Sequence, residues 1–502
     1  MKLEALLGDF EFEACDDIKS LEIADIATSA DKIGSGTLFV LYKSIKFDVK
    51  SIIGYILGKM PRAIICDGDL APENTDIPII KVADARRILP YLYLRFYGVS
   101  LNKMRFIGVT GTNGKSTTAT LISKMLREAG QKVGFMGTGI ISIDGEDING
   151  TDYSMTTPDP ELLYSTLARF EAAGCDTVVM EISSHALHFG KVAPISFDIA
   201  LFTNLSSEHM DLHGNIEEYY KTKLKLFNQT KLGIFNFDDY YSRKAYSEVR
   251  CDKASVGVVR KGDAIATDVR LNGLDGIKFI YRYGDRLLNV KSALAGAYNV
   301  YNAIMALTAA IAYGVPPCIA KRALGKVTRI DGRLETVSEK PRVIIDYAHT
   351  VEALTNVLKT IISVKKAEQK LILVFGCGGE RDREKRPQMA TVAEKYADLS
   401  IVTTDNSRGE SVVDILEDIL SGFKNTKSRK VITSRAAAIQ NAILSAADQD
   451  IIAVIGKGHE RYNIDKSGYH AFDERKIIRE ALNKREDIKL KDADTVNSST
   501  NA

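Results

Sequence analysis

The sequence has no marked excess of charge of either sign, because 67 Lys and Arg residues stand against 65 Asp and Glu residues. Such a chain lacks an overall basic field to gather nucleic acid, so any charged ligand must be held by local groups. Hydrophobic residues make up 45% and charged residues 26% of the chain, as in ordinary soluble proteins. We therefore predict a soluble protein that does not bind nucleic acid.

Cysteine and long apolar runs are also scarce. Six cysteines are scattered over 502 residues without a CxxC pair, which indicates reduced cysteines and not a disulfide framework or a zinc site. No apolar run approaches the ~18 residues that cross a bilayer, and residues 1–17 are acidic, unlike a signal peptide. These features predict a cytoplasmic protein without a membrane segment. The cysteines are Cys15, Cys66, Cys175, Cys251, Cys318 and Cys377.

No internal repeat is visible, and 502 residues are too many for one compact core. Short apolar runs alternate with polar turns over residues 1–100, which is typical of a small α/β domain. Strands alternate with helices over residues 101–334 and again over residues 335–502, which predicts a central doubly wound parallel sheet and a Rossmann-like C-terminal domain. The polar segment 489–502 is predicted to be disordered.

The strongest local signal is a glycine-rich turn between an apolar strand at 105–110 and a helix that Gly130 ends. In such a loop backbone N–H groups bind phosphate oxygens, Lys115 reaches the β- and γ-phosphates and Ser116 binds Mg²⁺. Val109 stands where the usual phosphate loop has its first glycine, so the loop is a shortened relative. A turn that binds nothing would not explain Lys-Ser at a helix start. The predicted loop is Gly111, Thr112, Asn113, Gly114, Lys115, Ser116 and Thr117.

Two further strands end in polar residues that have no packing role. Glu181 directly follows the apolar run VVM, and His209 comes shortly after the apolar run FDIALF. Ligands of open α/β sheets bind at the carboxyl ends of the strands, so both side chains are expected beside the γ-phosphate. Alone, either residue is more often a satisfied surface group. Together with the phosphate loop, they predict a site for a second Mg²⁺ ion.

A series of short motifs, in order from residue 110 to residue 460, resembles that of the Mur ligases, the ATP-dependent amide-forming enzymes of peptidoglycan precursor synthesis. Within this family the chain is most similar to the branch that makes the UDP-N-acetylmuramoyl-tripeptide. So many motifs in one order are not expected by chance. The motifs are TGTNGKST (110–117), TTPDP (156–160), EISSHAL (181–187), TNLSSEHMDLHG (203–214), YYKTKLKLF (219–227), AYNVYNA (297–303), DGRLE (331–335), DYAHT (346–350), GCGGERDREKRP (376–387), DNSR (405–408) and GKGHE (456–460).

The resemblance implies an N-terminal UDP-substrate-binding domain, a central ATPase domain and a C-terminal amino-acid-binding domain. It implies that ATP converts the carboxylate of UDP-MurNAc-L-Ala-D-Glu to an acyl phosphate, which the amine of meso-diaminopimelate attacks. A carboxylate is a poor electrophile until one of its oxygens becomes a phosphate leaving group. Transfer between two anions needs cations in place. Lys115 and two Mg²⁺ ions, held through Ser116, Glu181 and His209, would supply them.

The motif YYKTKLKLF contains a lysine that the family carbamylates with CO₂. By sequence alone Lys221, Lys223 and Lys225 form a solvated helix face, and only the resemblance singles out Lys223. A carbamate is an anion that can support Mg²⁺, whereas an ammonium beside two cations is repelled. The implied catalytic set is Lys115, Glu181, His209 and Lys223.

The resemblance also implies which residues bind the two nucleotides. Asn299 and Asn302 are expected by the adenine, Arg333 by the phosphates, Asp346 on the ribose, and His349 beside the nucleotide. The UDP-linked substrate is expected to contact Ser29, Thr156, Thr157, Ser184 and Lys191.

The C-terminal domain contains Asp405-Asn406-Ser407-Arg408, where diaminopimelate-adding members of the family carry DNPR. The distal end of diaminopimelate is a zwitterion, so Arg408 can pair with its carboxylate and Glu460 can accept from its ammonium. A lysine-adding enzyme needs no such arginine. DNSR could also be a simple turn, and Ser407 frees a backbone that proline would fix. The implied amino-acid ligands are Arg381, Asp405, Asn406, Arg408, Gly456 and Glu460.

The N-terminal segment departs from the family pattern. Ser29 and the turn and strand at 36–40 are kept, whereas the flanking Asp and Arg are missing, and Lys191 replaces an arginine in the muramyl-peptide site. A Mur-like ligase that joins an amino acid to another carboxylated carrier outside the cell wall therefore stays open, as does addition of L-lysine.

Two other classes explain fewer of the motifs. A non-catalytic nucleotide-binding scaffold would not need all five of Lys115, Ser116, Glu181, His209 and Lys223. A folylpolyglutamate-type ligase shares the phosphate loop but does not explain DNSR together with GKGHE. We predict a monomeric ligase that uses ATP, a UDP-MurNAc-dipeptide and a diamino acid.

Overall fold

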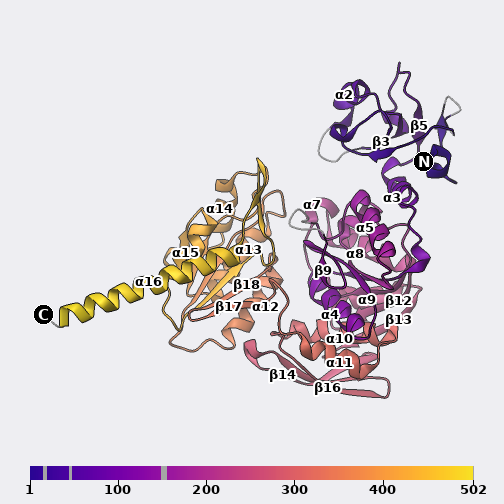
Figure 1. The fold of residues 1–502 in the computed structure, drawn as a ribbon. Coiled ribbons are helices and arrows are strands. Elements are labelled where there is room, and N and C mark those ends of the chain that lie inside the picture. The colour runs from indigo at the N-terminus through magenta and orange to yellow at the C-terminus, as the bar shows by residue number, and fades with distance from the viewer. Residues whose placement is uncertain (15–17, 19, 44–47, 149–154, 501–502) are drawn as a thin grey trace.

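The computed structural model describes residues 1–14, 18, 20–43, 48–148 and 155–500. Its strands form three larger sheets that follow one another along the chain, here called the N-terminal unit (β1–β5), the central unit (β6–β16) and the C-terminal unit (β17–β24). The N-terminal unit lies at one end of the central unit, and the C-terminal unit lies beside the central unit (Figure 1). Three α/β units are the predicted fold class; the domain limits drawn from the sequence stay a prediction.

The N-terminal unit contains a five-stranded sheet in the order β1-β5-β4-β3-β2. Its strands are parallel except for β1, which is antiparallel to β5. The apolar runs of the sequence form β3, β4 and β5, and every residue of β3 is buried. The elements are α1 (Leu3–Leu7), β1 (Glu13–Ala14), β2 (Asp25–Ala27), β3 (Thr37–Leu41), α2 (Ile53–Gly58), β4 (Ala63–Asp67), β5 (Ile79–Val82) and α3 (Ala85–Phe96).

The central unit contains an eleven-stranded sheet in the order β16-β15-β14-β13-β12-β11-β6-β10-β7-β8-β9. Neighbours from β14 to β7 are parallel, as predicted, whereas β8 and β9 at one edge and β15 and β16 at the other are antiparallel. The strands are β6 (Arg105–Thr110), β7 (Val133–Gly137), β8 (Ile140–Ile143), β9 (Glu146–Asp147), β10 (Thr177–Glu181), β11 (Phe197–Phe202), β12 (Thr230–Asn236), β13 (Asp252–Gly257), β14 (Ala264–Leu271), β15 (Ile277–Tyr283) and β16 (Arg286–Ser292).

Helices pack on both faces of this sheet. Successive side chains of a strand point to opposite faces, so Phe106 belongs to the hydrophobic cluster that contains Leu163 of α5, while Ile107 belongs to a second cluster that contains Leu121 of α4. A buried face on each side explains why the middle of β6, residues 106–109, is apolar, whereas the exposed Arg105 begins the strand. The helices are α4 (Lys115–Glu128), α5 (Pro160–Ala172), α6 (Ser184–His188), α7 (Met210–His213), α8 (Ile216–Leu224), α9 (Tyr240–Glu248), α10 (Tyr298–Tyr313) and α11 (Pro317–Lys326).

The C-terminal unit contains a six-stranded sheet in the order β17-β18-β22-β19-β20-β21, parallel except for β17, and a small hairpin of β23 and β24. Ile344 and Ile345 again enter different clusters on the two faces. The elements are β17 (Glu335–Glu339), β18 (Arg342–Asp346), α12 (Val351–Ile362), β19 (Leu371–Phe375), α13 (Lys385–Tyr396), β20 (Leu399–Val402), α14 (Val412–Leu420), β21 (Arg429–Val431), α15 (Arg435–Ser445), β22 (Ile451–Ile455), β23 (Tyr462–Asp465), β24 (Gly468–Ala471) and α16 (Glu474–Thr500).

The strand register places the predicted site at one edge of the central sheet. Val109 pairs with Glu181 of β10 and with Leu201 of β11, so these three parallel strands end together. The phosphate loop, Glu181 and the segment that carries His209 therefore leave the sheet on the same side.

The C-terminal segment differs from the prediction of disorder. Helix α16 continues to Thr500 and extends away from the C-terminal unit (Figure 1). The segment 489–500 is polar but contains neither Gly nor Pro, so nothing in its composition stops a helix that the preceding residues have started.

The described cysteines form no disulfide with one another. Cys66, Cys175, Cys251, Cys318 and Cys377 are free, and Cys15 lies outside the described residues. Burial raises the pKa of the Cys377 thiol to about 12. Within the part of the chain that the structure describes, no helix is both long and apolar enough to cross a membrane.

Candidate active site

A cavity of about 870 Å³ is lined by residues of both the central and the C-terminal unit. Three of the predicted site residues, Ser29, Gly111 and Asn299, do not line it. The cavity brings together all the others, which are Thr112, Asn113, Gly114, Lys115, Ser116, Thr117, Thr156, Thr157, Glu181, Ser184, Lys191, His209, Lys223, Asn302, Arg333, Asp346, His349, Arg381, Asp405, Asn406, Arg408, Gly456 and Glu460.

The phosphate loop connects β6 to α4 through two glycines with positive φ, Gly111 at 142° and Gly114 at 86°. A Cβ atom on Gly111 would lie 1.9 Å from the Thr203 Oγ1 atom, so only glycine fits there. Lys115 folds back over the loop, and its Nζ donates to the carbonyl oxygens of Gly111 at 3.0 Å and Thr112 at 2.8 Å. Burial lowers the pKa of Lys115.

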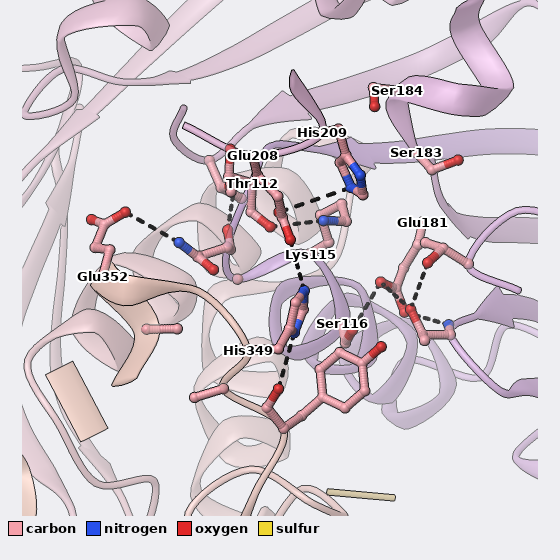
Figure 2. A pocket seen from close by; sticks show the side chains of 18 of the residues that line it. Thr112, Lys115, Ser116, Glu181, Ser183, Ser184, Glu208, His209, His349 and Glu352 are labelled. Atoms are coloured by element: carbon pink, nitrogen blue, oxygen red, sulfur yellow. Dashed lines mark hydrogen bonds and ion pairs between the residues drawn. The ribbon is translucent and has the colours of Figure 1, made fainter. Parts of the chain in front are cut away.

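Ser116 and Glu181 meet where the helix begins (Figure 2). The Ser116 hydroxyl donates to Glu181 Oε2 at 2.8 Å, and Glu181 Oε1 accepts from the Thr138 backbone N–H at 2.9 Å. Glu181 is only 1% exposed. Arg333, from the joint between the two units, donates from Nη2 to the Ser116 hydroxyl at 2.9 Å. The Glu181 carboxylate thus accepts from the Ser116 hydroxyl, from the Thr138 N–H and, at 3.3 Å, from the Thr138 hydroxyl.

Lys223 is buried at the other side of the loop instead of belonging to a solvated helix face. It is 1% exposed, and its Nζ donates to the Gly111 carbonyl oxygen at 3.0 Å. Burial and the nearby Lys115 ammonium hold the pKa of Lys223 well below its usual range. Lys221 is exposed and pairs with Glu218 at 2.7 Å, so the tertiary structure separates two lysines that look equivalent in the sequence.

His209 begins helix α7 with a φ of 58°, which turns its side chain into the cavity. Burial lowers the pKa of His209 to about 3, so its imidazole is neutral at physiological pH. Its ring lies 5.0 Å from the ring of His185, centroid to centroid. A neutral imidazole has a free nitrogen lone pair, which a cation can use as a ligand.

The side chains that could bind Mg²⁺ fit this ion only if they act as two separate pairs of ligands. Among the described residues, no three His, Cys, Asp or Glu side chains are grouped to hold a metal ion. Ser116 pairs with Glu181, and His209 Nε2 lies 3.9 Å from Oε2 of Glu208. Mg²⁺ is commonly bound through one or two carboxylates plus waters and substrate phosphates, so two pairs suit it. Lys223 joins this set only as an anion.

The residues predicted to bind ATP either line the cavity or lie directly behind a residue that does. Asn302 lines the cavity and donates to Asn299 Oδ1 at 2.8 Å, and Asn299 in turn donates to a backbone carbonyl, so Asn299 supports Asn302 from behind. Asp346 is 5% exposed and accepts from the backbone N–H groups of Leu334 at 2.6 Å and Ala348 at 2.7 Å. His349 Nε2 lies 2.8 Å from Glu208 Oε1.

Two arginines form one side of the cavity at the end where the amino acid is predicted to bind. Arg408 has a φ of 52°, and its Nη1 donates to the carbonyl oxygens of Gly379 at 2.8 Å and Asn406 at 3.2 Å. Its side chain thus donates to carbonyl oxygens and not to a carboxylate. Burial and the neighbouring Arg381 lower the pKa of Arg408. Two guanidinium groups this close to each other can bind an anion between them.

An anionic group forms the other side. Asn406 donates from Nδ2 to Glu460 Oε2 at 2.9 Å, and its Oδ1 accepts from the buried Lys457 at 2.7 Å. Lys457 also lies 3.4 Å from Asp405 and 3.7 Å from Glu460, so one cation stands between two carboxylates. Gly456 has a φ of 124°, and a Cβ there would lie 2.7 Å from Asp405.

The residues predicted for the UDP-linked substrate lie in two places: four line the cavity, and one lies in the N-terminal unit. Thr157 donates to the Glu181 carbonyl oxygen at 2.8 Å, and the buried Ser184 hydroxyl has no hydrogen-bond partner among the residues that the structure describes. Lys191 pairs with Asp159 at 2.6 Å. Ser29 instead lies in the N-terminal unit, just before the short 3₁₀ turn Ala30–Lys32, and outside the cavity.

Two family models match the chain, the Mur ligase middle domain over residues 109–310 and the Mur ligase glutamate ligase domain over residues 332–458. Together they cover more than half of the sequence. The chain belongs to the Mur ligase family.

Similar proteins agree with this family. The UDP-N-acetylmuramoyl-L-alanyl-D-glutamate–2,6-diaminopimelate ligase of Syntrophomonas wolfei is 36% identical over 96% of this chain and 99% of its own length. The ligase of the same name from Aquifex aeolicus is 38% identical over 92% of this chain and 94% of its own length. A solved structure with that name covers 97% of this chain and 99% of its own, with 27% identity and a TM-score of 0.65. The MurF ligase of Thermotoga maritima, solved with ADP, shares the fold at 18% identity and a TM-score of 0.60.

The sequence reasoning missed several residues of this Mur ligase site. Glu208 directly precedes His209, but its link to His349 joins two distant segments and leaves no local signal. Asp238 and Asp239 follow β12, so the strand-end argument could have found them. Both line the cavity, where the Tyr301 hydroxyl donates to Asp238 at 3.0 Å.

Proposed function

We propose that this Mur ligase joins meso-diaminopimelate to UDP-MurNAc-L-Ala-D-Glu in an ATP-dependent reaction. The observation that carries the proposal is a cavity shared by the central and C-terminal units, in which a phosphate loop faces an amino-acid subsite with one cationic and one anionic side. The names of the relatives support the choice of substrates. A nucleotide-binding scaffold would not need this second subsite.

The proposed chemistry has two steps. The substrate carboxylate takes the γ-phosphoryl group of ATP and becomes an acyl phosphate with release of ADP. The neutral amine of the amino acid then attacks the acyl carbon and loses one proton, the C–O bond to phosphate breaks, phosphate leaves, and an amide bond forms. Lys115 and the loop N–H groups would bind the phosphates, with Asn302, Asp346 and His349 around the nucleoside.

Mg²⁺ is the metal that this donor set would hold. Glu181 with Ser116 and His209 with Glu208 are the protein ligands that we propose. Bound Mg²⁺ supplies positive charge that makes transfer between two anions less unfavourable. The residues themselves hold and orient the phosphates and the carboxylate.

We also propose that Lys223 is carbamylated. Its buried Nζ donates to the Gly111 carbonyl oxygen at 3.0 Å and lies within 3.5 Å of the Thr110 hydroxyl, and no carboxylate of the described part of the chain pairs with it. A neutral amine can attack CO₂ and lose one proton, which gives a carbamate anion. The carbamate anion would attract the Lys115 ammonium, whereas a Lys223 ammonium would be repelled by it.

The amino acid would enter at the end of the cavity that Arg381 and Arg408 line. Diaminopimelate carries both a carboxylate and an ammonium at its distal end. The two arginines would bind the carboxylate, while Asp405 and Glu460 would bind the ammonium. L-lysine offers only the ammonium and would leave the arginines without a partner.

The UDP end of the substrate would bind the N-terminal unit, with Ser29 near the uracil. Thr156, Thr157, Ser184 and Lys191 would hold the muramyl-peptide end. The proposed enzyme is monomeric and cytoplasmic, with the three functional domains at 1–100, 101–334 and 335–502.

An amino-acid panel tests the proposal. The full chain is incubated with ATP, Mg²⁺, UDP-MurNAc-L-Ala-D-Glu and one of meso-, LL- or DD-diaminopimelate, L-lysine or L-ornithine, and the product mass is measured. We expect the tripeptide product with meso-diaminopimelate. Equal or better turnover with L-lysine would contradict the choice of amino acid.

A different carboxylated carrier is the second candidate, because Ser29 lies outside the cavity and the loop around it departs from the family pattern. The discriminating measurement is phosphate release with UDP-MurNAc-L-Ala-D-Glu present or absent. If this compound leaves ATP hydrolysis unchanged, the cell-wall substrate is excluded.

A further inference from the structure

Two loops of the C-terminal unit carry the two arginines of the amino-acid subsite. The first loop spans residues 376–382 and carries Arg381, and the second loop spans residues 405–410 and carries Arg408. The loops touch directly, because the Gly379 N–H donates to the Asn406 carbonyl oxygen at 2.9 Å and Arg408 donates to the Gly379 carbonyl oxygen at 2.8 Å. The position of one arginine therefore depends on the loop that carries the other.

Arg386, in the first turn of α13, is hydrogen-bonded to both loops from outside the cavity. It is 0% exposed and does not line the cavity. Its Nη1 and Nη2 donate to the two carboxylate oxygens of Glu410, each at 2.7 Å. Nη2 also donates to the Gly378 carbonyl oxygen at 3.2 Å, and Nη1 to Asp418 at 2.8 Å. One buried guanidinium thus holds the first loop, the second loop and helix α14.

Glu410 extends the same connection. Its Oε2 accepts from the Glu380 backbone N–H at 2.8 Å, next to Arg381. In return, the Gly409 N–H of the second loop donates to the Glu380 side chain of the first loop at 3.2 Å. The Arg386–Glu410 pair therefore connects the two loops. It holds the first loop next to Arg381, and it holds the second loop directly after Arg408.

The two substrate-facing arginines need such support. They carry like charges and both line the same cavity, so each disfavours the position of the other. The second loop also has Ser407 where a proline would fix φ. A bidentate pair between an arginine and a carboxylate supplies a fixed geometry that a lysine cannot reproduce.

We propose that Arg386 is a positioning residue for the amino-acid subsite: through Glu410 and Gly378 it holds Arg381 and Arg408 where they bind the distal carboxylate of the amino acid. This inference rests on the proposed function. Arg386 does not touch the substrate, and it sets specificity because only the diaminopimelate carboxylate depends on the two arginines.

The test measures kcat/KM for meso-diaminopimelate and for L-lysine, by phosphate release from the full chain with saturating ATP and UDP-MurNAc-L-Ala-D-Glu. For Arg386→Lys we expect the ratio of the two values to fall about tenfold, as a charged hydrogen bond to the substrate is misplaced. The ratio is the decisive quantity, because a loss of folded protein lowers both values equally. The KM for ATP is expected to stay unchanged.

Arg485→Lys is the matched control. Arg485 is another buried arginine of the C-terminal unit, which donates to the Ile443 carbonyl oxygen at 2.7 Å and to Asp448 at 2.7 Å, away from the cavity. It should lower Tm without changing the ratio. Glu410→Gln provides a second variant with the expected fall in the ratio, and it decides the question if Arg386→Lys does not fold.

An unchanged ratio in folded Arg386→Lys, or in Glu410→Gln where the first variant does not fold, would overturn the positioning role. A wild-type chain that does not turn over meso-diaminopimelate would instead overturn the proposed function, and the positioning role with it. The two failures are distinguished by the wild-type measurement alone.

Discussion

His349 Nε2 lies 2.8 Å from Glu208 Oε1, and this contact joins the C-terminal unit to the central unit beside the phosphate loop (Figure 2). Arg333 and Ser116 make a second connection at 2.9 Å, and Asn113 and Glu352 a third at 3.2 Å. All three contacts involve the edge of the ATP subsite. Closure of the two units and occupation of this subsite are therefore expected to depend on each other.

Glu208→Gln tests the importance of this contact. The amide keeps the shape but loses the charge, so the C-terminal unit is held less firmly and the amine is oriented less well. We expect kcat for ligation to fall about tenfold, a small part of what orientation can contribute. Glu352→Gln, at an exposed position of the same boundary, should have a smaller effect. Equal kcat values for Glu208→Gln and the wild type would show that the contact is not needed.

Lys115→Ala tests the phosphate loop. Lys115 is the lysine of the loop, and its loss removes the positive charge that neutralises the transferred phosphoryl group. We therefore expect ADP formation to fall at least about 100-fold. The control is Lys124→Ala, an exposed lysine on the same helix. Circular dichroism spectra should be the same for both variants. Substantial ADP formation by Lys115→Ala would argue for another phosphate site.

Lys223 carbamylation can be observed directly. In ¹³CO₂-equilibrated buffer the wild type is expected to give one carbamate signal in ¹³C NMR, because burial lowers the pKa of Lys223 and so favours the nucleophilic neutral amine. Lys223→Arg should lack the signal and the activity, whereas Lys221→Arg should keep both. A carbamate signal that persists in Lys223→Arg would assign the modification to another amine.

Arg408→Ala tests the choice of amino acid. The distal carboxylate of diaminopimelate would lose a charged hydrogen bond, so kcat/KM for this substrate should fall about 10- to 100-fold. The value for L-lysine should change far less, because L-lysine has no distal carboxylate. Parallel losses for both amino acids would show that Arg408 acts on the loop and not on the substrate.

Asp239 gives a prediction on pH and stability. Burial raises its pKa from 3.8 to about 6 in the folded protein. A raised folded-state pKa stabilises the fold most below the unfolded-state value, and this contribution is lost as pH rises through about 6. Asp239→Asn, which keeps an oxygen for the Ser242 N–H, should therefore gain stability relative to the wild type between pH 4 and pH 7, by up to about 3 kcal/mol. Urea unfolding of both proteins across this range measures the gain, and a constant difference would contradict it.

Local sequence patterns sufficed for much of the fold. The alternation of apolar runs and turns predicts the parallel strands around β6, because a strand buried on both faces must be apolar throughout. It did not predict the helical course of α16 to Thr500. Polar composition alone does not distinguish a solvated helix from a disordered tail, because both leave the side chains in water.

The phosphate loop could be recognised from the sequence because its function depends on neighbouring residues. Two glycines, a lysine and a serine within seven positions produce the turn, the charge and the hydroxyl together. Glu181 could be found because a carboxylate after a buried strand has no packing role. The motif series then identified the family, because it preserves order along the chain.

Only the tertiary structure decided which of three similar lysines is buried against the loop, and which arginine is buried between the two loops that carry Arg381 and Arg408. Lys223 and Lys221 differ by two positions, but the helix turns one inward and the other to solvent. Likewise, Glu208 meets His349 and Arg386 meets Glu410 across long stretches of chain. Such contacts depend on how sheets and helices pack, and packing is a property of the whole fold and not of any local pattern. The sequence by itself determined the chemistry of the phosphate loop, and the packing determined the charges and partners around it.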